Sequence, residues 1–184
     1  MRARSAVVIA TVLAASIGLG GCTTATSSTA PHAVTPTTAP TKASALNALL
    51  PTYPVKLTAA VAKTNTVAAA DAIQDLIAKT DIVNVDDGSQ AVAATKTTGA
   101  YYGVVRAITV SKGFDVTTQG EAMDKLLVAA GWTQRQDTNK SGIYAVLLSC
   151  ATAVGTPALL LLKADSTVAA TPVISIQLIS PDLP

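Results

Sequence analysis

Residues 118–150 read TQGEAMDKLLVAAGWTQRQDTNKSGIYAVLLSC, which joins the pattern of a helix to that of two antiparallel strands. Thr118 and Glu121 have the spacing of a capping box at a helix start, and Gly131 is typical of a helix stop. Between them, apolar residues at three- and four-residue spacing predict one buried helix face, formed by Met123, Leu126, Leu127 and Ala130. We expect strands over Trp132–Asp137 and Ile143–Cys150, joined by the polar segment 138–142.

Further strands are predicted on both sides of this stretch. Residues 158–162 are uninterruptedly aliphatic and predict a central strand, whereas Lys163–Thr171 predicts a turn region. In the last strand, apolar residues alternate with polar ones, so one side should be wet; the apolar positions are Ile174, Ile176 and Leu178. Upstream, Tyr101–Val110 is rich in β-branched and aromatic residues and predicts another strand. The Asp-Gly pair within residues 86–89 favours a tight turn and predicts a hairpin between strands at 82–85 and 90–94.

A second helix is expected across Leu57–Thr80, where apolar residues recur at helical spacing. Helix, strands, helix and then four successive strands predict an α+β fold. We expect a mainly antiparallel sheet of five or six strands with two helices on one face. This single globular domain should span residues 55–184, about 130 residues, which is long enough for one ordinary core.

The segment before this domain lacks hydrophobic periodicity. Residues 23–43 are rich in Thr, Ala and Pro. Such a segment cannot bury enough apolar area to offset its ordering entropy, so we expect a disordered tether over residues 22–54. Within the tether, residues 44–50 can form a short helix that begins at Ser44 and stops before Pro51.

The first 22 residues have the layout of an export signal, with basic Arg2 and Arg4 followed by an uncharged, largely apolar run to residue 21. The run closes on Leu19-Gly20-Gly21-Cys22, which resembles the lipobox of bacterial lipoproteins. The resemblance implies removal of the signal peptide 1–21 and attachment of lipid to the Cys22 thiol. It places the domain on the extracytoplasmic face of the cell membrane, held by that lipid. The alternative is a transmembrane anchor, for which this run is at the short limit.

A second, looser resemblance covers residues 100–150. The predicted helix there and its exit through Gly131-Trp132-Thr133 are similar to small uncharacterised lipoproteins of high-GC Gram-positive bacteria. That likeness implies no established activity.

Composition narrows the classes of function. Charged residues make up 13% of the chain and aromatic residues 3%, which excludes a highly charged disordered chain and a nucleic-acid arm. The chain has 13 Lys and Arg residues and 11 Asp and Glu residues. Removal of the signal peptide takes away Arg2 and Arg4, which leaves 11 basic and 11 acidic residues. A mature chain without net charge has no electrostatic attraction for nucleic acid.

Few residues can support catalysis or metal binding. The one histidine, His32, falls in the tether, so the domain has no imidazole for a Ser–His–Asp or Cys–His arrangement or for a zinc site. The acidic residues within 81–87 lack the spacing of a calcium loop, because the fifth position would be a glycine. We therefore expect no enzyme activity, no cofactor and no metal. With Cys22 lipidated, Cys150 has no disulfide partner, and we expect a buried, unreactive thiol.

One grouping suggests contact with a ligand or a partner, and it consists of Tyr101, Tyr102, Arg106 and Trp132. Alternation along the strand puts Tyr102 and Arg106 on the same face, among apolar neighbours. An arginine there can pair with an acid, extend to water at the sheet edge, or receive an anion. The tyrosines can equally be packing residues.

Together these features predict a membrane-anchored, non-catalytic lipoprotein. It would be a binding or envelope-assembly module that engages an envelope protein or a cell-wall partner. The alternative is an extracytoplasmic carrier of small molecules or lipids, with an aliphatic cavity between helices and sheet. A closed core with an exposed apolar patch favours the module, and an enclosed cavity favours the carrier.

Overall fold

The computed structural model describes residues 42–184. The predicted signal peptide, the predicted lipid attachment site Cys22, His32 and most of the predicted tether lie outside the described residues. The described chain is α+β, as expected, with all sheet pairings antiparallel.

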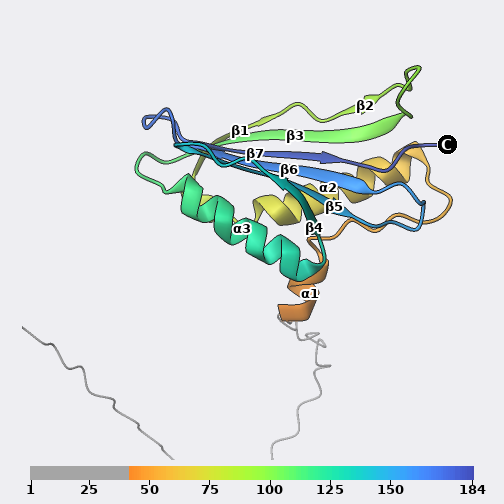
Figure 1. Ribbon diagram of the computed structural model, residues 1–184, viewed down its shortest axis with the longest axis horizontal. Coiled ribbons are helices and arrows are strands. Elements are labelled where there is room, and N and C mark those ends of the chain that lie inside the picture. Colours follow the sequence, from red (N-terminus) through yellow and green to blue (C-terminus); the bar gives the residue numbers. More distant parts are fainter. Residues whose placement is uncertain (1–41) are drawn as a thin grey trace, which may run out of the picture. The chain divides into compact units, whose positions relative to one another are not determined.

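One antiparallel sheet of seven strands forms the body of the domain, so the expected count of five or six was too low. The strands in chain order are β1 (Ile82–Asp87), β2 (Gln90–Val92), β3 (Tyr101–Val110), β4 (Thr133–Asp137), β5 (Ile143–Cys150), β6 (Ala158–Asp165) and β7 (Val173–Ile179). Their order across the sheet is β1-β3-β7-β6-β5-β4, and β2 also pairs with β3. The last strand therefore lies in the middle, between β3 and β6 (Figure 1).

Three α-helices accompany the sheet: α1 (Lys42–Asn47), α2 (Ala59–Gln74) and α3 (Val116–Ala130). A short 3-10 turn at Lys79–Asp81 leads into β1. Helix α2 packs against β3 and β7, and α3 packs against β5 and β6. Figure 1 shows both long helices on the same side of the sheet, while the other side carries no helix of the described residues.

The α2 and α3 boundaries differ from those expected. Helix α3 begins before Thr118, because Asp115 is the N-cap and its Oδ1 accepts the Thr118 backbone N–H at 3.0 Å. Thr118 is thus the third helical residue. Its backbone N–H is capped by Asp115, and its side chain is not the N-cap. Gly131 ends α3 with a φ of 118°, as expected. Helix α2 ends at Gln74, earlier than the predicted Thr80, and Ile77 then turns into the core at 1% exposure.

The predicted hairpin at residues 86–89 is wrong. Strands β1 and β2 do not pair with each other; each pairs with β3. Asp87 faces Arg106, the Gly88 N–H donates to the carbonyl of Val105 at 2.9 Å, and Gln90 faces Gly103. As the chain advances from residue 87 to residue 90, its partners on β3 run steadily back from residue 106 to residue 103. The chain therefore does not reverse, and β1 and β2 form one interrupted edge strand. Gly88 is accordingly not among the glycines with positive φ.

Two further segments extend the folded part of the chain beyond the predictions. Strand β6 continues to Asp165 instead of turning at Lys163, because the segment still pairs with β5 and β7. Side chains within residues 46–53 pack onto the domain, where Leu49 and Tyr53 are each 3% exposed. The Tyr53 hydroxyl forms a hydrogen bond of 2.8 Å with Thr66 Oγ1 on α2. The compact unit therefore begins before Val55.

The core fills the layer between the sheet and the two long helices. It uses every second residue of the central strands, and the fully buried members include Val104, Ile108, Val146, Leu148, Leu160, Leu162, Ile174, Ile176 and Leu178. From α3, Met123 and Leu127 join this core, whereas Leu126 is 38% exposed and does not belong to the buried face predicted for it. Cys150 is buried, as expected.

Candidate functional site

The sheet has an open face, which is the side opposite α2 and α3. Odd-numbered residues of β3, β5, β6 and β7 point to it, because their even-numbered neighbours fill the core. Near its centre lies a group of aliphatic side chains that we call the apolar patch: Val105, Leu147, Leu159, Leu161 and Ile179. Val105 is 43% exposed, and the other four are half-buried.

The members of the apolar patch are neighbours across strands. Leu147 faces Leu161, and Leu159 faces Ile179, so four aliphatic side chains lie in two adjoining pairs. Gln177 stands between Leu161 and Val105, and Gln136 of β4 faces Leu147 at the other end of that row. Side chains directly opposite each other in a sheet pack together, so the two leucine and isoleucine pairs form the continuous part of the patch. Val105 lies beyond Gln177, diagonal to Ile179.

Two pairs of polar side chains on the open face are bonded to each other. Lys163 Nζ lies 2.8 Å from Asp165 Oδ2, and hydrogen bonds from Lys163 and then from Thr167 lower the pKa of Asp165 to about 2. At the β4 edge, Arg135 Nε donates to Ser149 Oγ at 2.6 Å, which leaves Ser149 only 2% exposed. An apolar centre with a polar rim is the usual anatomy of a protein–protein interface.

A hollow of about 360 Å³ adjoins the apolar patch where β3 and β6 begin and β7 ends. We call it the Tyr101 pocket. The residues that line it are Thr98, Tyr101, Thr156, Pro157, Leu159, Ile179, Ser180 and Asp182. Leu159 and Ile179 belong to the apolar patch as well, so pocket and patch form one continuous surface.

Glycines shape this pocket on two sides. A Cβ added at Gly103 would lie 3.6 Å from Cε2 of Tyr101, so the tyrosine ring lies over Gly103 on the open face. A Cβ added at Gly99 would come within 2.8 Å of Asp182 Cβ, a contact that a larger residue could not make. Asp182 is held there because its N–H donates to Thr156 Oγ1 at 3.2 Å and the next N–H, of Leu183, donates to the carbonyl of Ala100 at 2.7 Å.

A second hollow, of about 400 Å³, lies at the end of the domain between the start of α2 and the last residues described. Its walls are residues 55–58, Val154, Thr156 and residues 182–184. Like the Tyr101 pocket it is open to solvent, and neither of the two lies between the helices and the sheet.

The four residues suggested as a contact group are not brought together. Tyr101 lies on the open face, whereas Tyr102 and Arg106 point to the helix side, where they are 8% and 7% exposed. Trp132 is 2% exposed, and its Nε1–H donates to the carbonyl of Leu49 at 3.0 Å. This bond ties the segment after α1 to the end of α3.

Of the alternatives left open for Arg106, the structure has the pairing with acids. Its NH2 nitrogen lies 2.7 Å from Asp71 Oδ1 and its Nε lies 3.4 Å from Asp87 Oδ2. Its NH1 nitrogen donates to Gln74 Oε1 at 3.2 Å. Hydrogen bonds from Ser89 and from Arg106 hold the pKa of Asp87 below its usual value. The guanidinium thus links α2, β1 and β3.

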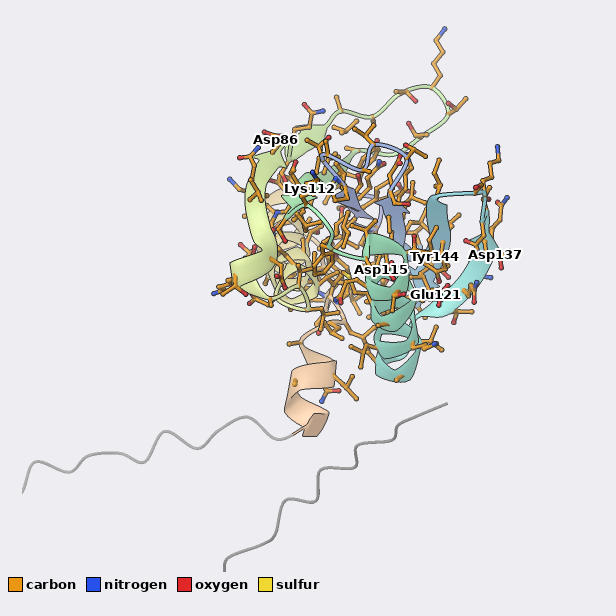
Figure 2. The ribbon with its side chains drawn as sticks, turned by 90° about the vertical axis from the view of Figure 1, so that its left-hand side faces the viewer. Asp86, Lys112, Asp115, Glu121, Asp137 and Tyr144 are labelled. Atoms are coloured by element: carbon orange, nitrogen blue, oxygen red, sulfur yellow. The ribbon has the colours of Figure 1, made fainter. Side chains whose placement is uncertain are left out.

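Two further ionisable side chains, those of Cys150 and Tyr144, are buried. Burial raises the pKa of the Cys150 thiol to about 11, which keeps it protonated at neutral pH. The Tyr144 hydroxyl donates to Asp124 Oδ2 at 2.7 Å, and burial followed by this bond raises its pKa. Figure 2 shows Glu121 and Asp137 on the same side of the molecule as Tyr144. Within residues 42–184, no three His, Cys, Asp or Glu side chains are grouped so that they could hold a metal ion.

The aliphatic residues of the open face were not among the predicted site residues. A continuous aliphatic run such as 158–162 usually means a strand that is covered on both faces. The available signal was the number of amphipathic helices, since two helices can cover only one face of a wide sheet.

Among the helices of residues 42–184, none combines the length and hydropathy that a membrane crossing requires. Comparison of the chain with protein-family models, with curated proteins and with solved structures gives no match.

Proposed function

We propose that the chain is a non-catalytic binding module that engages a protein partner through the open face of its sheet. The observation that carries this proposal is the apolar patch beside a core that is closed on the helix side. Soluble domains rarely leave contiguous aliphatic side chains facing water unless they mark an interaction surface. The lipobox at Cys22 adds that the module is a lipoprotein anchored on the extracytoplasmic face of the cell membrane, so the partner would belong to the cell envelope.

The carrier alternative finds less support. A carrier of small molecules or lipids needs a concave site that surrounds most of its ligand. The two hollows described above are open to solvent and lie at one end of the domain, away from the layer between helices and sheet. Reproducible co-purification of a lipid with the chain would favour the carrier.

Site-specific crosslinking in living cells tests the module. A photoreactive amino acid is placed at Leu161, at the centre of the apolar patch, and for comparison at Leu126, the exposed leucine of α3. The full chain is used, so that processing and anchoring are kept. We expect one defined protein adduct from position 161 and none from position 126.

A second variant links the adduct to the open face. Leu147→Asp puts a charge next to Leu161 and should abolish the adduct, while the variant stays folded with a modest loss of stability, because Leu147 is half-buried on the open face and is not part of the core. Equal crosslinking from both positions, or an adduct that survives the Leu147 change, would refute the open face as the binding surface.

A further inference from the structure

We propose that the Tyr101 pocket binds a lysine or arginine side chain of the protein partner. This assignment rests on the proposed function, since it names the chemistry by which the partner would be held at one end of the open face. Three features of the pocket carry it: its aliphatic floor, its aromatic wall and its single carboxylate.

The floor suits the methylene stem of a long side chain. Leu159 and Ile179 face each other across β6 and β7, and Pro157 continues the apolar surface at the start of β6. Lysine and arginine bury their stems along such surfaces while their charged ends remain polar. A volume of about 360 Å³ leaves ample room for one such side chain.

The charge of the pocket selects a cation. Asp182 is the one charged residue among those that line it, and none of the ion pairs within residues 42–184 involves Asp182. Its backbone is held in place by the hydrogen bonds that the N–H groups of residues 182 and 183 donate, while its side chain lies close to Gly99 and is exposed. An anion would be repelled by this carboxylate. A neutral apolar side chain gains no attraction from this carboxylate, which is exposed and stays hydrated.

The aromatic ring of Tyr101 also favours a cation in the pocket. The Tyr101 ring lies over Gly103 and lines the pocket beside Ile179. A cation near the face of such a ring is attracted by the ring quadrupole. A carboxylate and an aromatic ring at one aliphatic pocket together discriminate a cationic side chain from a neutral one of similar length.

The test uses small probes in place of the unidentified partner. N-acetyl-lysine methylamide is titrated into the full chain in non-ionic detergent micelles, and the methyl NMR signals of Leu159 and Ile179 are followed. The norleucine analogue, which has an aliphatic stem and no charge, is the comparison. We expect saturable shifts with the lysine probe and binding about fivefold weaker with the norleucine probe.

Two variants and a matched control complete the test. Asp182→Asn should weaken the lysine probe about fivefold and leave the norleucine probe unchanged, and Tyr101→Leu should weaken the lysine probe as well. Asp75→Asn removes a carboxylate on the helix side and should change neither affinity. Equal affinity for both probes, or no saturable shift of either methyl group, would overturn the cation site. Crosslinking at Leu161 could still succeed in that case, so failure of the pocket is distinguishable from failure of the proposed function.

Discussion

Two adjacent leucines in β6 provide a direct test of the one-sided sheet. Leu160 is 0% exposed beneath the helices, whereas Leu161 is half-buried on the open face. Leu160→Ala removes side-chain carbons worth about 2.4 kcal/mol, at roughly 0.8 kcal/mol for each buried methylene. The cavity that remains between sheet and helices adds to this loss, so we expect about 3–4 kcal/mol of destabilisation. Leu161→Ala should cost only about 1 kcal/mol, because the vacated space opens to water.

The measurement is urea unfolding of the two full-chain variants, followed by the fluorescence of Trp132. This residue is the only tryptophan of the chain and is 2% exposed, so its emission reports loss of the core. With slopes of about 1–3 kcal/mol per molar urea, the two midpoints should differ by roughly 1 M or more. The pair Leu159→Ala and Leu162→Ala repeats the comparison, because Leu162 is 0% exposed and Leu159 faces outward. Equal losses at Leu160 and Leu161 would mean that the outer face is also packed, and the open-face interpretation would fail.

Three further outcomes are expected. Gly120→Val should destabilise the fold by about 1–3 kcal/mol in the same urea assay, since even a Cβ there would lie 3.0 Å from Ala164 Cβ and 3.1 Å from Tyr144 Cδ1; a neutral result would show that α3 can move off the sheet. The folded state raises the pKa of Cys150 from 9.0 to about 11, so its contribution to stability is complete below pH 9 and is lost as the pH rises to about 11. Cys150→Ala should therefore make stability fall less steeply across that range, and an unchanged slope would contradict the burial effect. Cys22→Ala should shift the chain from the detergent phase to the aqueous phase in a partition assay, or leave the signal uncleaved; a processed variant that stays in the detergent phase would contradict lipid anchoring.

Much of the secondary structure could be predicted from local patterns. The bounds of β3 and β5 match the expected strands, and Gly131 ends α3 as expected. These successes share a cause: the period of apolar side chains and the positive φ of a helix-terminating glycine are both properties of a few adjacent residues. The N-cap of α3 was misplaced because Asp115 and Thr118 both favour helix starts, and only the hydrogen bond between them shows which one caps.

The antiparallel pairing of β4 with β5 was expected from the short polar segment between them, but partners distant in the sequence could not be obtained in the same way. The pairing of β7 with β3 depends on contacts between residues about 70 positions apart, which no local period encodes. The Asp-Gly pair at residues 87–88 is equally compatible with a hairpin and with a bend in one strand, and pairing of both halves with β3 decides for the bend.

The sequence by itself determined the α+β class, most strand positions and the buried setting of Cys150, because these depend on apolar period and run length. Only the tertiary structure decided which aliphatic residues would remain uncovered. Leu160 and Leu161 are identical in type and adjacent in the chain, yet one lies under the helices and the other on the open face. The difference arises because both helices pack on one side of the sheet, and that choice depends on where the crossing segments lead the chain in space. The Tyr101 pocket has the same origin, since it exists only where the starts of β3 and β6 meet the end of β7.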